Sequence, residues 1–371
     1  MKKEKVIVHI ITRLFLGGAQ KVVLNVLSYL KENGEDILLI TGRGEELTEE
    51  FKKKNIPIYE IKEFDRDLNP FNDTLSMIKI AIKIKMLKKE YNKVIVHTHT
   101  SKAGLLGRLA SLIAGVNEVY HTAHGWSFYK NQNIILRAIY SISELMASKI
   151  TKKIVGVSKS VIEEGISIGI NKEKFILIYN DIENMEKLNE FQKNIIRERL
   201  DIKENEKVVL QVSCLKKQKA PMDFIKIAER FKKEKLKFVL AGDGELRKDI
   251  EDYIKLKAIN NVILTGWYKN VYKLYNIADV FVLTSIFEGH PLVVLEYKQF
   301  NKPIILSDIA PNREIMKENA IFCLVHDVDC FTKKIKTAIK SERRNNSNKK
   351  EESKMKKSYE NLYSQNANIK L

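Results

Sequence analysis

Residues 280–300 read VFVLTSIFEGHPLVVLEYKQF, a stretch that decides the fold because a strand, a loop and a helix follow one another in it. Residues 280–284 are apolar and rich in β-branched side chains, as in a strand buried on both faces. Glu288 lies in the loop, and Pro291 stands at the first helical position, where its missing N–H is tolerated. This order predicts one strand-helix unit of a parallel sheet.

The same alternation of strand and helix occurs along the whole chain, in two series. The predicted strands are residues 6–12, 36–41, 94–98, 118–122 and 153–157, and then residues 208–213, 237–241, 262–265, 280–284 and 303–307. Repeated strand-helix units form parallel sheets with helices on both faces, because their crossovers are right-handed. The sequence therefore predicts an α/β protein with two doubly wound, Rossmann-like domains.

A charged stretch at residues 181–206 separates the two series and marks the domain boundary. At about 100 to 200 residues per domain, a chain of 371 residues is expected to hold two domains. We predict an N-terminal domain at residues 1–180 and a C-terminal domain at residues 181–354. A terminal helix within residues 355–371 is expected to join the N-terminal domain.

The net charge of +18 comes from two regions. Residues 71–160 hold 14 Lys/Arg against 4 Asp/Glu, residues 331–371 hold 12 against 4, and the remainder is neutral in sum. This distribution favours an enzyme with two basic surfaces over a protein that coats nucleic acid. Within the first region, residues 77–89 (MIKIAIKIKMLKK) suit either an amphipathic helix on anionic lipid or a solvated helix face.

Neither a membrane span nor a secretion signal is predicted. The most apolar stretch, residues 103–116, contains Arg108, and the apolar run near the N-terminus is interrupted by His9, Thr12 and Arg13. We expect a cytoplasmic protein, with peripheral contact to the inner face of the cytoplasmic membrane through the basic region.

Three cysteines, Cys214, Cys323 and Cys330, leave one unpaired in any disulfide scheme. No CxxC motif or Cys/His spacing typical of a metal site accompanies them. Reduced thiols are the expectation that fits a cytoplasmic protein.

Two further features indicate ligand binding. The glycine loop Gly17-Gly18-Ala19-Gln20 follows the first strand and opens a helix, so it is either a phosphate-binding loop or a simple tight turn. Glu296 follows four apolar helix residues, and a carboxylate that is partly buried needs hydrogen-bond donors. Ligand hydroxyls could supply these donors, or the side chain could remain half exposed.

Glu288 and Glu296 are separated by seven residues in EGHPLVVLE, which resembles the signature of the retaining GT-B glycosyltransferases of family four. Other segments are similar to further elements of that family in the same order: HIITRLFLGGAQ, VSCLKKQKAPMDFIKIAE, FVLAGDGELRKDIE, NVILTGW and LYNIADVFVLTS. The resemblance covers nearly the whole chain. It implies a GT-B fold, with an N-terminal acceptor domain and a C-terminal donor domain.

The resemblance also implies an activity. A sugar would pass from a nucleotide diphosphate, with UDP as the expected nucleotide, to a hydroxyl of a glycan or lipid-linked acceptor in cell-surface polysaccharide or glycolipid biosynthesis. The anomeric configuration would be retained, and neither a metal nor a cofactor would be needed. No nucleic acid is expected as a partner.

Roles for single residues follow from the same resemblance. Lys219 and the amides of Gly17 and Gly18 would bind the diphosphate, since positioned cations and amides stabilise a leaving anion. Glu288 and His124 would be catalytic, next to the donor sugar, and Glu296 would bind the ribose hydroxyls. The remaining donor-binding residues would be Gly289, His290, Pro291 and Leu292.

The chain departs from the family pattern at Cys214, where many members have an arginine that contacts phosphate. Lys216 or Lys217 could take its place, although lysine does not reproduce the bidentate geometry of arginine. Separately, His97 and His99 alternate along a strand, and we expect their side chains to point to opposite faces. A metal site at this HxH pair is disfavoured because no third ligand is apparent nearby.

Two other functions remain as alternatives. A nucleotide-sugar 2-epimerase would share the two-domain architecture, although the glycine loop and the Glu-x7-Glu signature disfavour it. A noncatalytic polyanion-binding protein would use the net charge, although the neutral remainder of the chain and the lack of nucleic-acid-binding motifs disfavour it.

Overall fold

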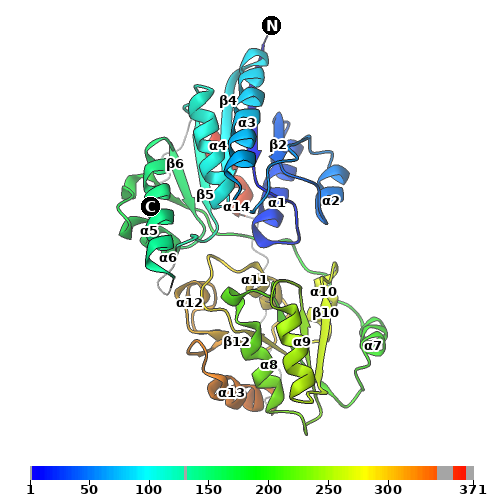
Figure 1. The fold of residues 1–371 in the computed structure, drawn as a ribbon. Coiled ribbons are helices and arrows are strands. Elements are labelled where there is room, and N and C mark those ends of the chain that lie inside the picture. The colour runs from blue at the N-terminus through cyan, green and yellow to red at the C-terminus, as the bar shows by residue number, and fades with distance from the viewer. Residues whose placement is uncertain (1, 129–131, 341–353, 365–371) are drawn as a thin grey trace. The chain divides into compact units, whose positions relative to one another are not determined.

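A computed structural model describes residues 2–128, 132–340 and 354–364, and it divides the chain into two compact units. Unit 1 comprises Met1–Asp181 and Glu352–Leu371, and unit 2 comprises Ile182–Glu351. Each unit is built on one parallel sheet with helices packed on it (Figure 1). The predicted doubly wound α/β architecture is thus confirmed.

The sheet of unit 1 has seven strands in the order β3-β2-β1-β4-β5-β6-β7. They are β1 (Lys3–Ile10), β2 (Ile37–Thr41), β3 (Ile58–Glu60), β4 (Tyr91–His99), β5 (Val119–Ala123), β6 (Lys153–Gly156) and β7 (Phe175–Leu177). The α-helices of this unit are α1 (Gly18–Glu32), α2 (Thr48–Lys53), α3 (Pro70–Glu90), α4 (Ser101–Ile113), α5 (Ile134–Lys149), α6 (Lys159–Ser167) and α14 (Lys354–Tyr363).

The sheet of unit 2 has six strands in the order β10-β9-β8-β11-β12-β13. They are β8 (Lys207–Val212), β9 (Leu236–Ala241), β10 (Val262–Gly266), β11 (Val280–Leu283), β12 (Ile304–Ser307) and β13 (Ile321–Cys323). Its α-helices are α7 (Glu190–Arg199), α8 (Pro221–Glu229), α9 (Arg247–Leu256), α10 (Val271–Ile277), α11 (Leu292–Lys298), α12 (Ala310–Met316) and α13 (Val328–Lys340). Two short 3₁₀ helices, Lys172–Lys174 and Lys217–Lys219, complete the two units.

In each unit the strand order reverses beside the first strand, between β1 and β4 and between β8 and β11. The connections on the two sides of this point run over opposite faces of the sheet. The loops that begin there therefore diverge from one another. In open parallel sheets ligands bind beyond the carboxyl ends of the strands at such a reversal. This position is therefore the first place to look for a functional site in either unit.

All ten predicted strands are present, with ends that shift by at most three residues. The structure adds β3, β7 and β13, each of only three residues. Runs this short carry no readable alternation of apolar and polar residues, which explains why they were missed. Pro291 is the N-cap residue of α11 and not its first helical residue.

Helix α14 lies in unit 1 beside α1, although it is remote from α1 in sequence (Figure 1). The hydroxyl of Tyr29 on α1 donates to Glu360 of α14 at 2.9 Å. Tyr359, Leu362 and Tyr363 are buried. A C-terminal helix on the N-terminal part of the chain is the arrangement expected from the sequence; residues 365–371 of the predicted segment lie outside the described residues.

Local signals in the sequence explain several helix starts. Asn69 accepts a hydrogen bond from the amide of Asn72 at the start of α3, and Pro70 stands in the first turn. Asn189 and Gln192 form a capping box at the start of α7. Helix α7 therefore begins inside the charged stretch at residues 181–206.

The expectation of reduced thiols is wrong for two of the three cysteines. Cys323, at the end of β13, and Cys330, on α13, form a disulfide bond, and Cys214 is the free, partly exposed thiol. A count of three cysteines excludes full pairing but not one bridge, and the short loop between them brings the two sulfurs together.

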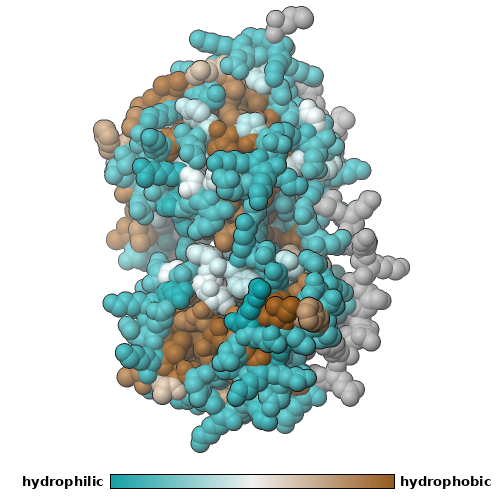
Figure 2. Space-filling view, turned by 90° about the vertical axis from the view of Figure 1, so that its right-hand side faces the viewer, coloured by the Kyte–Doolittle hydropathy of each residue, from teal (hydrophilic) through white to brown (hydrophobic). Residues whose placement is uncertain are grey.

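The face drawn in Figure 2 is mostly hydrophilic, with apolar patches separated by hydrophilic side chains. In the described part of the chain, no helix is both long and apolar enough to span a bilayer.

Candidate functional site

Two groups of polar side chains occupy the strand reversals, one in each unit. In unit 2 they lie in the loops after β8 and β11. In unit 1 they lie on β1 and β4 and directly after β5, next to the glycine loop that follows β1. Because the strands within each sheet are parallel, the loops that carry these side chains share one edge of their sheet.

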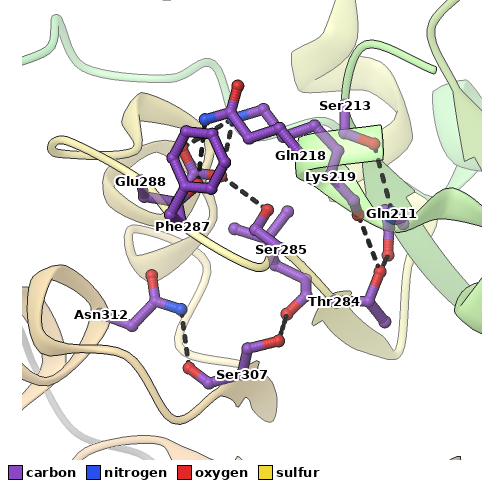
Figure 3. A network of polar contacts seen from close by, with 11 residues as sticks. Gln211, Ser213, Gln218, Lys219, Thr284, Ser285, Phe287, Glu288, Ser307 and Asn312 are labelled. Carbon is purple, nitrogen blue, oxygen red and sulfur yellow. Dashed lines mark hydrogen bonds and ion pairs between the residues drawn. The ribbon is translucent and has the colours of Figure 1, made fainter. Parts of the chain in front are cut away.

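In unit 2, Lys219 and Glu288 form an ion pair. The Lys219 ammonium lies 2.6 Å from both carboxylate oxygens of Glu288, and the hydroxyl of Ser285 donates to Oε1 of Glu288 at 2.6 Å (Figure 3). The Glu288 side chain is 5% exposed and that of Lys219 is 21% exposed. Two donors thereby hold the nearly buried carboxylate of Glu288 in one position. The Lys219 side chain is the more exposed partner of the pair.

Further hydrogen bonds tie the lysine loop to the glutamate loop. The hydroxyl oxygen of Thr284 lies 3.0 and 2.9 Å from the carbonyl oxygens of Lys219 and Ala220, so its one hydrogen is shared between them. The side-chain amide of Gln218 donates to the carbonyl of Phe287 at 2.9 Å, as seen in Figure 3. The two loops therefore form one rigid support for the ion pair.

The backbone beside Lys219 is in an unusual conformation. Ala220 has φ 42° and ψ 50°, in the left-handed region that an alanine rarely occupies. Such strain persists only where surrounding contacts enforce it, and it occurs often at functional sites. Here it turns the chain sharply from the lysine loop into α8.

Glycine is required in the loop after β9 for a close backbone approach. At Gly242, with φ +139°, an added Cβ would lie 2.0 Å from the carbonyl oxygen of Ser213. The loop after β9 therefore presses directly on the segment that leads to Cys214 and the lysine loop.

Glu296 lies on α11, one turn beyond the glutamate loop, and is 3% exposed. Its Oε2 accepts a hydrogen bond of 2.6 Å from the hydroxyl of Tyr275. Burial and the neighbouring carboxylate raise the pKa of Tyr275 well above its usual value, so the phenol remains a donor. The predicted burial of Glu296 is thus observed, with a tyrosine as one of its donors.

The other predicted donor-binding residues of unit 2 precede and begin α11. His290 is buried, and burial lowers its pKa to about 4, so its ring is neutral at pH 7. Pro291 caps the helix and Leu292 is its first residue, with Gly289 in the loop before them.

In unit 1, the glycine loop leads directly into α1. Gly17 is the N-cap residue and Gly18 the first residue of this helix. An added Cβ on Gly17 would lie 2.4 Å from Oε1 of Gln20 and 2.6 Å from the ring of Phe15. No side chain can occupy this position without displacing its neighbours, and the helix start is left without a capping side chain.

His124 directly follows β5 and is the partly exposed member of a group of histidines. Its Nε2 lies 3.1 Å from Nδ1 of His99, and Nε2 of His99 lies 2.9 Å from Nδ1 of His9. Burial lowers the pKa of His124 to about 4 and that of His9 to about 3. Both rings are therefore neutral at pH 7.

The prediction that His97 and His99 point to opposite faces is wrong. Their rings stack, with centroids 4.7 Å apart, and both stack on His9. Side chains two residues apart in a strand share a face, because the pleat repeats every two residues. The register of β1 and β4 places His9 opposite His97, which completes the stack.

This histidine group was missed from the sequence, although a signal existed. His9, His97 and His99 lie on two predicted strands, and His124 follows a third. In the described residues, no group of three or more His, Cys, Asp or Glu side chains is arranged to hold a metal ion. The histidine nitrogens bond to one another and to hydroxyl groups.

Comparisons with known proteins agree with this architecture. Residues 192–358 match the family described as glycosyl transferases group 1, and residues 16–183 match glycosyltransferase family 4. A UDP-Gal:alpha-D-GlcNAc-diphosphoundecaprenol alpha-1,3-galactosyltransferase of Escherichia coli is 30% identical over 335 residues, which cover 88% of this chain and 85% of the relative.

A second relative is the N,N'-diacetylbacillosaminyl-diphospho-undecaprenol alpha-1,3-N-acetylgalactosaminyltransferase of Campylobacter jejuni, 26% identical, with 76% of each chain covered. Among solved structures, Anabaena Alr3699/HepE in complex with UDP and glucose has a TM-score of 0.76 at 17% identity, covering 90% of this chain and 89% of that one. A sucrose-phosphate synthase from Thermosynechococcus elongatus gives 0.74 at 15% identity, covering 91% and 90%. These similarities extend over nearly the whole chain and confirm the predicted fold.

Proposed function

The chain belongs to the group 1 glycosyltransferases, and from this premise we propose that it transfers a sugar from a UDP-sugar to a hydroxyl of a lipid-linked acceptor, with retention of configuration and without a metal. The product would be an intermediate of a cell-surface polysaccharide or glycolipid. Two relatives support the acceptor class, since their names specify diphosphoundecaprenol substrates.

The observation that carries the site assignment is the ion pair of Lys219 and Glu288. During transfer, the bond from the anomeric carbon to the β-phosphate oxygen breaks, a bond to the acceptor oxygen forms, and the proton of the acceptor hydroxyl passes to the departing diphosphate. Negative charge grows on the departing diphosphate, and a positioned ammonium group stabilises it. We assign this task to Lys219, which Glu288 and the rigid loop hold in place before the donor arrives.

Glu288 and His124 are the side chains we assign to the donor sugar. The carboxylate of Glu288 is fixed by Ser285 and Lys219, so it can accept from sugar hydroxyls without rearranging. Neutral His124 can form a hydrogen bond to the sugar through Nδ1, because its Nε2 is already bonded to His99.

For the nucleotide, we assign Glu296 to the ribose hydroxyls. The amides of Gly289, His290 and Leu292 are assigned to phosphate or sugar oxygens, with Pro291 setting their direction. Gly17 and Gly18 supply the amides at the start of α1, where an anion is favoured by the helix dipole.

The proposal is tested by incubating the enzyme with a panel of UDP-sugars and a short polyprenyl-diphosphate-linked sugar in the presence of EDTA. We expect UDP release and a longer lipid-linked product that both depend on acceptor. Glu288→Ala and His124→Ala should cut turnover strongly while still binding UDP. An epimerised nucleotide-sugar formed without acceptor would instead establish the 2-epimerase, and activity that EDTA abolishes would refute metal independence.

A peripheral membrane contact is the second part of the proposal, and α5 is the element that supports it. Along one face of α5, Ile135, Ile139, Ile142 and Met146 are 52 to 66% exposed and follow helical spacing. Ile134, at the start of the helix, is 80% exposed. Exposed large apolar side chains gathered on one helix are characteristic of a surface that meets a partner or a membrane.

The net charge of the sequence region that contains this helix favours an anionic lipid surface as the partner. Residues 71–160, which include α5, carry a net charge of +10, and α3 adds exposed Ile78, Ile82 and Met86 among its lysines. Apolar insertion combined with basic side chains is the usual way an interfacial helix binds anionic lipid. A cytoplasmic enzyme on the inner face of the membrane would meet a lipid-linked acceptor there.

A further inference from the structure

Six hydrogen bonds join seven side chains of unit 1 into one chain from His124 to Tyr359. After His124, His99 and His9, the chain continues from Nε2 of His9 to the hydroxyl of Tyr363 at 3.0 Å. That hydroxyl lies 2.6 Å from Nδ1 of His97. Nε2 of His97 lies 2.7 Å from the hydroxyl of Thr122, which lies 3.1 Å from that of Tyr359.

Every member of this chain has one hydrogen to donate, provided that its histidines are neutral. Burial holds the pKa of His97 and His99 well below the usual value, as it does for His9. One hydrogen per member satisfies all six bonds only if every member donates in the same direction. If one member donated in the opposite direction, two hydrogens would face each other between neighbouring members, or a hydroxyl hydrogen would lack an acceptor.

The two ends of the chain decide the direction. Tyr359 is 1% exposed, and among the described residues Thr122 is the hydrogen-bond partner found for its hydroxyl. His124 is partly exposed, so solvent or a ligand can accept from it. If the hydrogens ran toward Tyr359, the last hydroxyl hydrogen would be buried without an acceptor, at the full cost of its desolvation. The hydrogens therefore run from Tyr359 and Thr122 toward His124.

We propose that Tyr363 is a positioning residue that relays this direction and holds His124 with its hydrogen on Nδ1. His99 then donates to Nε2 of His124, which leaves Nδ1–H as the group that His124 presents. Taken with the proposed function, on which this step rests, His124 meets the donor sugar as a hydrogen-bond donor and not as a general base. Helix α14 thus determines the chemistry of a side chain far from it in sequence.

The hydrogen-bond directions predict different effects for substitutions of Tyr363 and Tyr359, although both are buried tyrosines of α14. Tyr363→Phe removes a link in the middle, so the direction set by Thr122 no longer reaches His9, His99 and His124. Tyr359→Phe also removes a buried hydroxyl from α14, but Thr122 can still donate to His97. The second variant is therefore a matched control for a loss of packing or stability.

The test uses the full chain labelled with ¹⁵N-histidine, and spectra of the two-bond couplings in the imidazole rings. These spectra show which nitrogen carries the hydrogen, and the His124 signals are those that disappear in His124→Gln. We expect Nδ1–H at His124 in the wild type and in Tyr359→Phe, and a substantial Nε2–H population in Tyr363→Phe. Transfer kcat should fall about tenfold in Tyr363→Phe, as for loss of one oriented hydrogen bond, and less than about threefold in Tyr359→Phe.

Wild-type His124 with Nε2–H, or an unchanged ring state in Tyr363→Phe, would overturn the inference whether or not the enzyme transfers sugars. Equal loss of kcat in the two tyrosine variants, with unchanged ring states, would also overturn it and indicate a packing role. Absence of transferase activity in the wild type would refute the proposed function alone, because the ring state is measured on the protein without substrates.

Discussion

The ammonium group of Lys219 bonds to both carboxylate oxygens of Glu288 at 2.6 Å. A cation assigned to phosphate is therefore already paired with a carboxylate assigned to sugar. A diphosphate that binds Lys219 must share this cation with Glu288, so the two residues should affect nucleotide affinity in opposite directions.

We predict that Lys219→Met weakens UDP binding about 10- to 100-fold, since a hydrogen bond to a charged group contributes about 1.5 to 3 kcal/mol. Glu288→Gln should bind UDP at least as tightly as the wild type, because a competing negative charge is removed. Isothermal titration calorimetry measures both affinities. Lys226→Met, which replaces an exposed lysine on α8, is the control and should bind UDP normally. A tenfold loss of affinity in Glu288→Gln would contradict the assignment.

The buried histidines should make unit 1 sensitive to acid. Burial lowers the pKa of His9 to about 3 and of His124 to about 4, below the unfolded value of about 6.5. Between these values the unfolded chain binds more protons than the folded chain, so stability is present above pH 6.5 and is lost as the pH falls toward 4. Each such group lowers the free energy of unfolding by up to about 1.4 kcal/mol per pH unit in that window.

Urea unfolding at pH 7.5, 6 and 5 measures this loss. The chain has two tryptophans, and Trp126 is buried in unit 1. Its fluorescence in a Trp267→Phe background reports on unit 1 without a signal from unit 2. The same free energy of unfolding at pH 7.5 and pH 5 would show that the histidines are not held neutral.

Membrane binding should depend on the exposed face of α5. Replacing Ile139 and Ile142 by Asn removes two apolar side chains that would be buried when the helix inserts into a membrane. Each would contribute about 1.5 to 3 kcal/mol to the free energy of binding when fully buried. We expect sedimentation with anionic vesicles to fall at least tenfold, with little change in stability. Leu256→Asn on α9, where the leucine is 79% exposed, is the matched control. Equal binding of the wild type to neutral and anionic vesicles would count against the electrostatic part.

A buried ion pair should hold α4 to α5. Nη2 of Arg108 lies 2.7 Å from Glu144, and its side chain is fully buried. Glu144→Ala would leave a buried charge without its partner, so we predict a loss of about 3 to 5 kcal/mol in the free energy of unfolding. Trp126 fluorescence in urea measures it. Glu49→Ala, which removes an exposed ion pair with Lys52, should have no measurable effect on the free energy of unfolding. A comparable loss in both variants would show that burial does not make the Arg108–Glu144 pair more important.

The longer strands and the two-domain α/β architecture followed from the sequence because apolar β-branched runs alternate with amphipathic segments. The contact between Lys219 and Glu288 did not, because the residues are 69 positions apart and only the pairing of β8 with β11 brings them together. The histidine chain needed the register of β1 against β4 and the return of α14 to unit 1. The Cys323–Cys330 bridge depended on a local turn that no periodic pattern marks.

Because α14 belongs to unit 1 but follows all of unit 2 in the described part of the chain, unit 1 cannot become complete when its own strands have been synthesised. The ribosome must first make all of Ile182–Glu351, which at about 5 to 20 residues per second takes roughly 10 to 35 seconds. During that interval the site of Tyr359 and Tyr363 stays open, and His9 and His97 lack their phenolic partner. Unit 2 can therefore finish folding first, and the nascent N-terminal half is the part most exposed to chaperones and proteases.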